Sequence, residues 1–287
     1  MGRTLAFNSR VGVTLALAVL LKTFCFSQGN VYSQEAPKRT VEITYNFTVS
    51  DIPQQVQRIR IWVPQPLTDE HQKLIDVNVA GDRPYRLVEE SRFGNRFLLL
   101  DLNDTNSAGT SEIAFSMKFR VTRCAIRPSS EHPALAAAAK EEPALYLASN
   151  RMIPIDGKIA EEAKQVAGHV QDPLRQARLI YDHIVDTVRY DKTGTGWGRG
   201  DAVYACDVRK GNCTDFHSLF IGQARALGIP ARFIMGLPLP EDKTEGAIAG
   251  YHCWGEFYLH QKGWCPVDAS EAYKFPQKRE QFFCGLD

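Results

Sequence analysis

The sequence predicts an α+β protein in which a β-rich region precedes a domain of helices and strands. From Thr40 to about Arg123, apolar and polar residues alternate in short runs, as they do in half-buried strands. From Ile159 onward, apolar residues recur at helical spacing, and strand-like alternation returns near Tyr251. This change of period along the chain predicts two domains with a junction between them.

Residues 1–33 have the composition of an export signal. Arg3 and Arg10 precede an apolar stretch, Val11–Leu21, that is shorter than the about 20 residues of a membrane-spanning helix. We therefore expect a signal peptide and export to the periplasm or the cell exterior. Stable membrane insertion is expected only if this segment is retained as an anchor.

The segment 40–124 is predicted to be a β-sandwich-type domain with antiparallel strands. Four of its runs carry strand signals: 41–49, 59–63, 96–102 and 113–121. The last two are separated by a turn-rich loop, 103–109. Because this region holds no concentrated set of titratable residues, its predicted role is structural.

The next segment, 125–155, contains many Pro and Ala residues and is predicted to be a linker with a short helix at Pro133–Glu142. Domain 156–287 follows it. Two amphipathic helices open this domain, the second of them capped by Asp172 with Pro173 at its first position. Their apolar faces are interpreted as core.

A glycine-rich loop, Gly194–Asp201, follows these helices. Its glycines alternate, so they do not fit G-x-G-x-x-G, and no Gly-Lys-Ser/Thr is present. The loop is therefore interpreted as mobile rather than as a phosphate cradle. Trp197 in this loop, and Trp254 further along, are assigned to a candidate substrate cleft.

Composition and charge exclude several classes of function. Of the 34 basic residues, three lie in the leader, which leaves 31 against 33 acidic residues, and no basic run suggests a nucleic-acid partner. The six cysteines after the leader suggest disulfides, but their pairing is undetermined. Neither C-x-x-C, H-E-x-x-H nor an EF-hand loop occurs, so we expect no metal and no cofactor.

Cys213 is the strongest candidate for chemistry. It stands at the start of a helical stretch whose apolar residues form one stripe ending at Gly228, and Asp215 is placed to cap the first turn. The free N–H groups and positive dipole end of a helix start favour a thiolate, and the same groups can donate to an oxyanion. The position alone is not decisive, because buried or disulfide-bonded cysteines are common.

Two downstream residues complete a catalytic pattern. His252 lies in one predicted strand, 251–259, and Asp268 ends the next, 264–268. A hairpin centred near His260 would place His252 and Asp268 opposite each other on the same side of the sheet. In that arrangement the carboxylate orients the imidazole, and the other ring nitrogen takes the proton of Cys213.

These motifs resemble the transglutaminase-like superfamily. The resemblance rests on Gly211–Asp215, Gly228–Arg232, His252–Glu256 and Gly263–Asp268, and covers about 156–286. It implies a papain-like α+β core, with helices packed on an antiparallel sheet, and a Cys213–His252–Asp268 triad. Exported bacterial members with a preceding β-domain look similar over the rest of the mature chain. Two departures are that the chain stops at Asp287, where relatives commonly continue with further strands, and that Cys253 stands where a small residue is usual.

Two functions are consistent with these residues. The first is a cysteine protease or acyltransferase that attacks peptide or glutamine-type amides of a protein or peptide substrate through a thioester. The alternative is a non-catalytic peptide-binding or assembly module in which Cys213 is tied in a disulfide. His217, one helical turn after Cys213, is predicted to be structural. The remaining histidines are predicted to lie on the surface: His71, His132, His169, His183 and His260.

Overall fold

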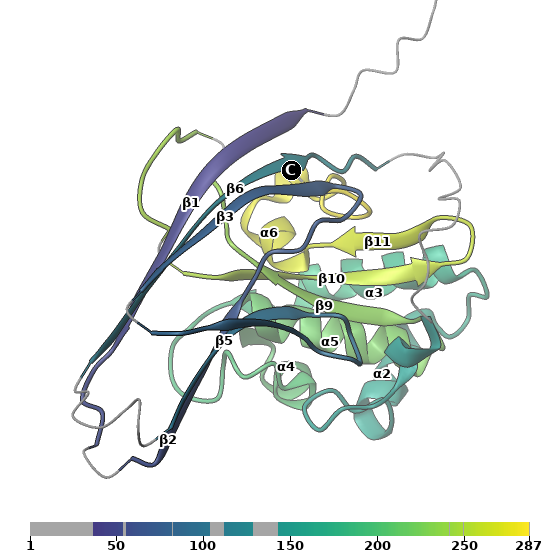
Figure 1. Ribbon diagram of the computed structural model, residues 1–287. Coiled ribbons are helices and arrows are strands. Elements are labelled where there is room, and N and C mark those ends of the chain that lie inside the picture. Colours follow the sequence, from purple (N-terminus) through teal and green to yellow (C-terminus); the bar gives the residue numbers. More distant parts are fainter. Residues whose placement is uncertain are drawn as a thin grey trace, which may run out of the picture. The chain divides into compact units, whose positions relative to one another are not determined.

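The computed structural model describes residues 37–53, 56–81, 83–103, 112–128, 143–240, 242–248 and 250–286. The predicted signal peptide and the predicted helix 133–142 lie outside these ranges. The first described region contains six strands, β1 (Lys38–Val49), β2 (Arg58–Pro64), β3 (Gln72–Gly81), β4 (Arg86–Glu89), β5 (Arg96–Asn103) and β6 (Ile113–Cys124) (Figure 1). They form two antiparallel three-stranded sheets, ordered β1-β6-β3 and β2-β5-β4.

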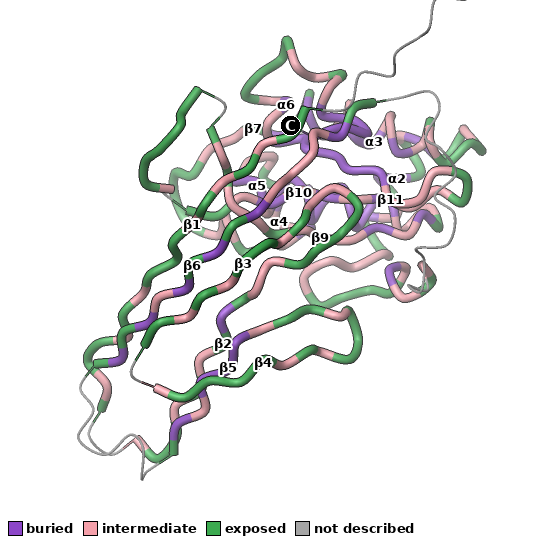
Figure 2. Tube along the Cα trace, turned by 45° about the horizontal axis from the view of Figure 1, so that its top comes forward, coloured by how far each residue is buried: buried purple, intermediate pink, exposed green. Residues whose placement is uncertain are grey.

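The two sheets share one hydrophobic core, which confirms the sandwich-type prediction. Along β6, every second residue from Ile113 to Val121 is buried, and this alternation can be followed in Figure 2. These side chains pack in one cluster with Leu98, Leu100 and Leu102 of β5. Each fully buried side chain of this size contributes about 1.5 to 3 kcal/mol to the free energy of unfolding.

Strands β3 and β4 were not predicted. In β3 the pairing with β6 shifts between Leu74 and Asp76, so the apolar residues on either side of this irregularity do not follow one alternating pattern. β4 has four residues, too few for a period to be recognised.

The second region has the predicted α+β composition. Its longer elements are α2 (Gly157–Ala167), α3 (Pro173–Thr187), α4 (Ala202–Val208), α5 (Cys213–Ala226), α6 (Ala269–Lys274), β9 (Ala231–Gly236), β10 (His252–Leu259) and β11 (Gly263–Val267). Short elements are η1 (Pro143–Leu147), β7 (Arg189–Tyr190), β8 (Lys210–Gly211) and η2 (Pro276–Lys278). β9, β10 and β11 form an antiparallel sheet with β10 in the middle.

Helix α5 is the centre of this region. It contacts β9 and β10 of the sheet and also helices α2, α3 and α4 (Figure 1). Every residue from Asp215 to Ala224 is buried, including the large side chains of Phe216 and Phe220. Because α5 is packed between the sheet and the other helices, the position of its first residue, Cys213, is fixed by that packing.

The helices of the described ranges include none that has both the length and the apolarity needed to cross a bilayer. The boundaries 40–124, 125–155 and 156–287 stay predictions.

Candidate active site

Cys213 is the first residue of α5, and the residues around it form a complete helix cap. The side chain of Asn212 accepts a hydrogen bond from the backbone N–H of Thr214 at 2.9 Å. Asp215 reaches back and accepts from the N–H of Asn212 at 3.0 Å, so a capping box closes the turn. Cys213 itself is 3% exposed.

The glycine-rich loop is fastened to this cap. The N–H groups of Gly198 and Gly200 donate to the two carboxylate oxygens of Asp215, at 2.6 and 3.3 Å. The structure thus anchors the loop that the sequence predicted to be mobile. It also turns these N–H groups toward a buried carboxylate, where they are not free to hold a phosphate. Gly200 needs its lack of side chain, because its φ is +68° and a Cβ would lie 3.0 Å from both Thr214 and Ser218.

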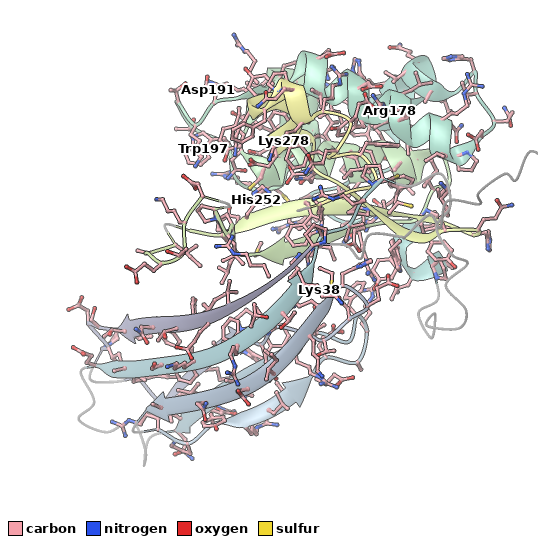
Figure 3. The ribbon with its side chains drawn as sticks, turned by 90° about the horizontal axis from the view of Figure 1, so that it is seen from above. Lys38, Arg178, Asp191, Trp197, His252 and Lys278 are labelled. Atoms are coloured by element: carbon pink, nitrogen blue, oxygen red, sulfur yellow. The ribbon has the colours of Figure 1, made fainter. Side chains whose placement is uncertain are left out.

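His252 and Asp268 lie within hydrogen-bonding distance of each other. His252 begins β10 (Figure 3), and its Nε2 lies 2.5 Å from Oδ2 of Asp268. The other carboxylate oxygen accepts from the hydroxyl of Ser270 and the N–H of Glu271, both at 2.9 Å. Asp268 is 2% exposed and caps α6, so its position is set by three donors. Ser270 was not foreseen from the sequence, because no motif distinguishes it.

The hairpin that brings them together is not centred where the sequence suggested. The pairs Gly255↔Val267 and Leu259↔Gly263 place its centre at Gln261, one residue later than expected. Asp268 therefore lies beyond the last pair, one position past the partner of Gly255, and is not opposite His252. Asp268 lies past the end of β11, so its carboxylate reaches His252 from the N-cap position of α6 and not through alternation along the strand.

The imidazole of His252 connects Asp268 to Cys213. With Nε2 taken by Asp268, the other ring nitrogen is left for the sulfur of Cys213, with which the imidazole shares a hydrogen bond. Burial alone lowers the pKa of His252, but the hydrogen bonds with Asp268 and Cys213 raise it to about 10. Burial favours the protonated form of Asp268, yet its bond to His252 keeps the carboxyl pKa below the usual range.

The pKa of Cys213 falls to about 4. The largest cause is a hydrogen bond from the thiol of Cys253, and the hydrogen bond and charge of His252 add to it against the effect of burial. Near neutral pH the pair is therefore a thiolate and an imidazolium. This is the reactive form of a cysteine nucleophile.

His217 has a structural position, as expected. It is fully buried, its Nδ1 donates to the carbonyl of Cys213 at 2.7 Å, and its Nε2 accepts from the N–H of Ala269 at 3.1 Å. These two bonds fix one neutral tautomer, and burial lowers the pKa of the ring. Both nitrogens are used, so His217 cannot act as the base.

The two tryptophans assigned to the candidate substrate cleft, Trp197 and Trp254, have different surroundings. The ring centroid of Trp254 on β10 lies 6.4 Å from that of His252, which places Trp254 beside the triad. The indole N–H of Trp197 donates to Gly194 within its own loop at 3.2 Å (Figure 3). A hollow of about 430 Å³ adjoins the first turn of α5, where Thr214 and Ser218 line it together with Arg199 and Arg151.

A second cluster of titratable groups was not foreseen. Glu162 on α2 accepts from Cys206 on α4 at 2.9 Å, and its other oxygen lies 2.6 Å from Nε2 of His183 on α3. Arg209 donates to the same carboxylate. The prediction that His183 lies on the surface is wrong: it is half-buried and bonded, because three packed helices converge there.

The six cysteines of the described ranges are all free thiols, and two pairs of them share hydrogen bonds, Cys213 with Cys253 and Cys265 with Cys284. Among the described residues, no group of three or more His, Cys, Asp or Glu side chains is arranged to hold a metal ion.

Comparison with known proteins supports the assignment of this domain. Residues 161–269 match the model of the transglutaminase-like superfamily. The chain therefore contains a segment, 161–269, that is similar to the transglutaminase-like core. A solved structure of a candidate cysteine protease from Cytophaga hutchinsonii is similar, with a TM-score of 0.61 and 21% identity over 82% of this chain and 78% of that one.

Two further bacterial proteins show similarity to this chain. An uncharacterised protein of Haemophilus influenzae is 27% identical over 286 residues, covering 91% of this chain and 77% of its own length. The periplasmic domain of TgpA from Pseudomonas aeruginosa gives a TM-score of 0.43 at 20% identity, over 86% of this chain and 75% of that one.

Proposed function

We propose that this protein is a cysteine-dependent acyl-transfer enzyme that acts on peptide or glutamine-type amides of a protein or peptide substrate. The observation that carries the proposal is the continuous hydrogen-bonded chain from Asp268 through His252 to Cys213. A buried carboxylate orients the imidazole, and the imidazolium stabilises a thiolate at a helix N-terminus. The low pKa of Cys213 is the expected result of this arrangement.

In the proposed reaction the thiolate attacks the carbonyl carbon of the amide. The cap uses the N–H groups of Thr214 and Asp215, and we assign the developing oxyanion to the N–H of Cys213 at the helix start. His252, held as imidazolium by Asp268, then donates its proton to the leaving nitrogen, and ammonia or an amine departs. A thioester remains on Cys213.

Resolution of the thioester decides the class of enzyme. Attack by water, with His252 as base, makes the protein a peptidase or amidase; attack by a lysine amine makes it a transglutaminase. Trp254, beside His252, and the hollow next to Thr214 are the proposed contacts for the substrate. The composition of the leader supports action outside the cytoplasm.

The proposal is tested with p-nitrophenyl acetate, which needs no knowledge of the natural substrate. We expect a burst of one equivalent of p-nitrophenol and an acetyl group on the tryptic peptide 211–225, whose only cysteine is Cys213. With a glutamine peptide, ammonia is expected from both reactions, and incorporation of a fluorescent primary amine then identifies transamidation. Cys213→Ala should abolish the burst, and Cys206→Ala, a buried cysteine outside the site, should retain it. A burst that survives Cys213→Ala, or a folded wild type with no burst, would favour the non-catalytic module.

A further inference from the structure

A second sulfur lies against the nucleophile and has no part in the proposed reaction. Cys253 follows His252 in β10 and is fully buried. The odd-numbered side of β10 faces α5, because a Cβ on Gly255 would lie 3.5 Å from Phe220 and 3.8 Å from His217. Cys253 therefore faces the start of α5, where its thiol donates to Oγ1 of Thr214 at 3.7 Å and lies close enough to Cys213 to lower the pKa of that residue.

Charge and burial give the two sulfurs different chemical states. Cys213 is a thiolate next to the imidazolium of His252. The interaction with Cys213 and burial raise the pKa of Cys253 far above the ordinary value. One sulfur is thus a ready nucleophile, while the other is a protonated thiol held in contact with it.

We propose that Cys253 is a modification site: the resolving cysteine that closes a reversible disulfide with Cys213 after a hydroperoxide has oxidised the nucleophile. This inference goes beyond the proposed acyl transfer, because it needs only a reactive thiolate at Cys213 and a thiol in contact with it. It does not depend on which amide the protein accepts.

The first step oxidises Cys213. Its thiolate attacks one oxygen of the hydroperoxide, the O–O bond breaks, and the proton of His252 passes to the departing oxygen. With hydrogen peroxide the products are a sulfenic acid on Cys213 and one water. The sulfur loses two electrons, and the peroxide gains them.

The second step forms the disulfide. Once Cys213 is a neutral sulfenic acid, the negative charge that kept the proton on Cys253 is gone, and His252 is free to accept that proton. The sulfur of Cys253 attacks the sulfenic sulfur, the S–O bond breaks, and the oxygen leaves as a second water with the released proton. Two thiols and one peroxide thus give one disulfide and two waters.

The disulfide would inhibit acyl transfer and at the same time protect Cys213 from further oxidation. In the disulfide, Cys213 cannot attack an amide, yet it is shielded from further oxidation to the irreversible sulfinic and sulfonic acids. A dithiol reductant returns two electrons and restores the thiolate. The usual small residue at position 253 would leave the nucleophile without such a partner.

The chain provides an internal comparison. Cys265 and Cys284 also share a hydrogen bond, and Cys284 donates its backbone N–H to the carbonyl of Pro266 at 2.8 Å. The charged side chains that most affect these two thiol pKa values are Lys262, Glu256 and Arg178. Interaction between two sulfurs is therefore common to both pairs, but among the described residues an imidazolium is a leading influence at the Cys213–Cys253 pair and not at the other.

The test is disulfide mapping after a short exposure of the reduced protein to one equivalent of hydrogen peroxide. Trypsin separates all four sulfurs into peptides with one cysteine each, 211–225, 244–262, 263–274 and 280–287. After free thiols are blocked with N-ethylmaleimide, we expect the linked 211–225 and 244–262 peptides to exceed the 263–274 and 280–287 pair by roughly tenfold. Reduction with dithiothreitol should restore labelling of Cys213.

Variants make the outcome decisive. Cys253→Ala and the near-isosteric Cys253→Ser should abolish the link and convert Cys213 to sulfinic and sulfonic acids that dithiothreitol does not reverse. Cys265→Ala, a matched change in the other pair, should leave the 213–253 link unchanged. The inference is overturned if peroxide leaves Cys253 as a free thiol while Cys213 is overoxidised in the wild type. It is also overturned if recovery by dithiothreitol is the same with and without Cys253. Because the readout is peptide mass, either result is independent of amide turnover.

Discussion

Two clusters in this molecule contain the same three kinds of group, a cysteine, a histidine and a carboxylate, but join them in different orders. At the candidate active site the imidazole of His252 lies between Asp268 and Cys213. In the second cluster the carboxylate of Glu162 is in the middle, bonded to both Cys206 and His183. The order of the contacts determines what each cysteine can do.

Because of this order, the pKa values of Cys206 and Cys213 shift in opposite directions. Burial and donation to Glu162 raise the pKa of Cys206 to about 12, so it remains a thiol. At the other cluster, contact with Cys253 and an imidazolium lowers the pKa of Cys213 to about 4. A thiol next to a carboxylate keeps its proton, whereas a thiol next to an imidazolium loses it. A Cys-His-carboxylate composition is therefore no evidence of catalysis without the order of contacts.

The largest expected effect is that of His252→Ala. Removing the base and the imidazolium should lower the rate of acyl transfer by about 10³-fold or more, as measured by steady-state kinetics with p-nitrophenyl acetate. The matched change His183→Ala removes the histidine of the second cluster and should leave the rate within about threefold of the wild type. Comparable losses in both variants would show that the two clusters do not differ in function.

A smaller loss is expected for Asp268→Asn, which keeps the acceptor for Ser270 but removes the charge. Because the carboxylate holds the pKa of His252 at about 10, its removal should shift the alkaline limb of the rate–pH profile to lower pH. The rate itself should fall by about 10²-fold. An alkaline limb that does not move would mean that Asp268 does not support the imidazolium.

Glu162→Gln should change stability and leave the chemistry alone. Glu162 joins α2, α3 and α4, and loss of its charge should cost about 1 to 3 kcal/mol of unfolding free energy, measured by urea denaturation. Despite burial, its hydrogen bonds lower the carboxyl pKa from 4.5 to about 2. A depressed pKa stabilises the fold above the unfolded value, so this contribution should be present above pH 4.5 and disappear as the pH falls toward 2. The difference between wild type and variant should shrink across that window; a constant difference would contradict the charge argument.

The two clusters also differ in how much of each could be predicted from the sequence. Helical spacing predicted α2, α3 and α5, and the cap residues placed Cys213 at a helix start. The short hairpin brought His252 and Asp268 together although its centre lies one residue later than expected. These features depend on local sequence or on one short hairpin.

Contacts between distant segments could not be predicted in the same way. The second cluster brings together Glu162, His183 and Cys206 from three helices, and their meeting depends on how those helices pack. The contact between Cys213 and Cys253 likewise depends on the packing of α5 against β10. Cys253 was visible in the sequence as an unusual residue, but its partner was not.

The most direct test of the central claim is the pH dependence of iodoacetamide labelling at Cys213 and Cys206, read from tryptic peptides 211–225 and 200–209. Cys213 is 3% exposed and Cys206 is 8% exposed, so access alone would favour Cys206. We predict that labelling of Cys213 rises to half its maximum near pH 4 and that Cys206 stays unlabelled through pH 10. If both cysteines label together, with the midpoint near about 8.5 that is ordinary for a free thiol, the order of contacts does not control reactivity and the account fails.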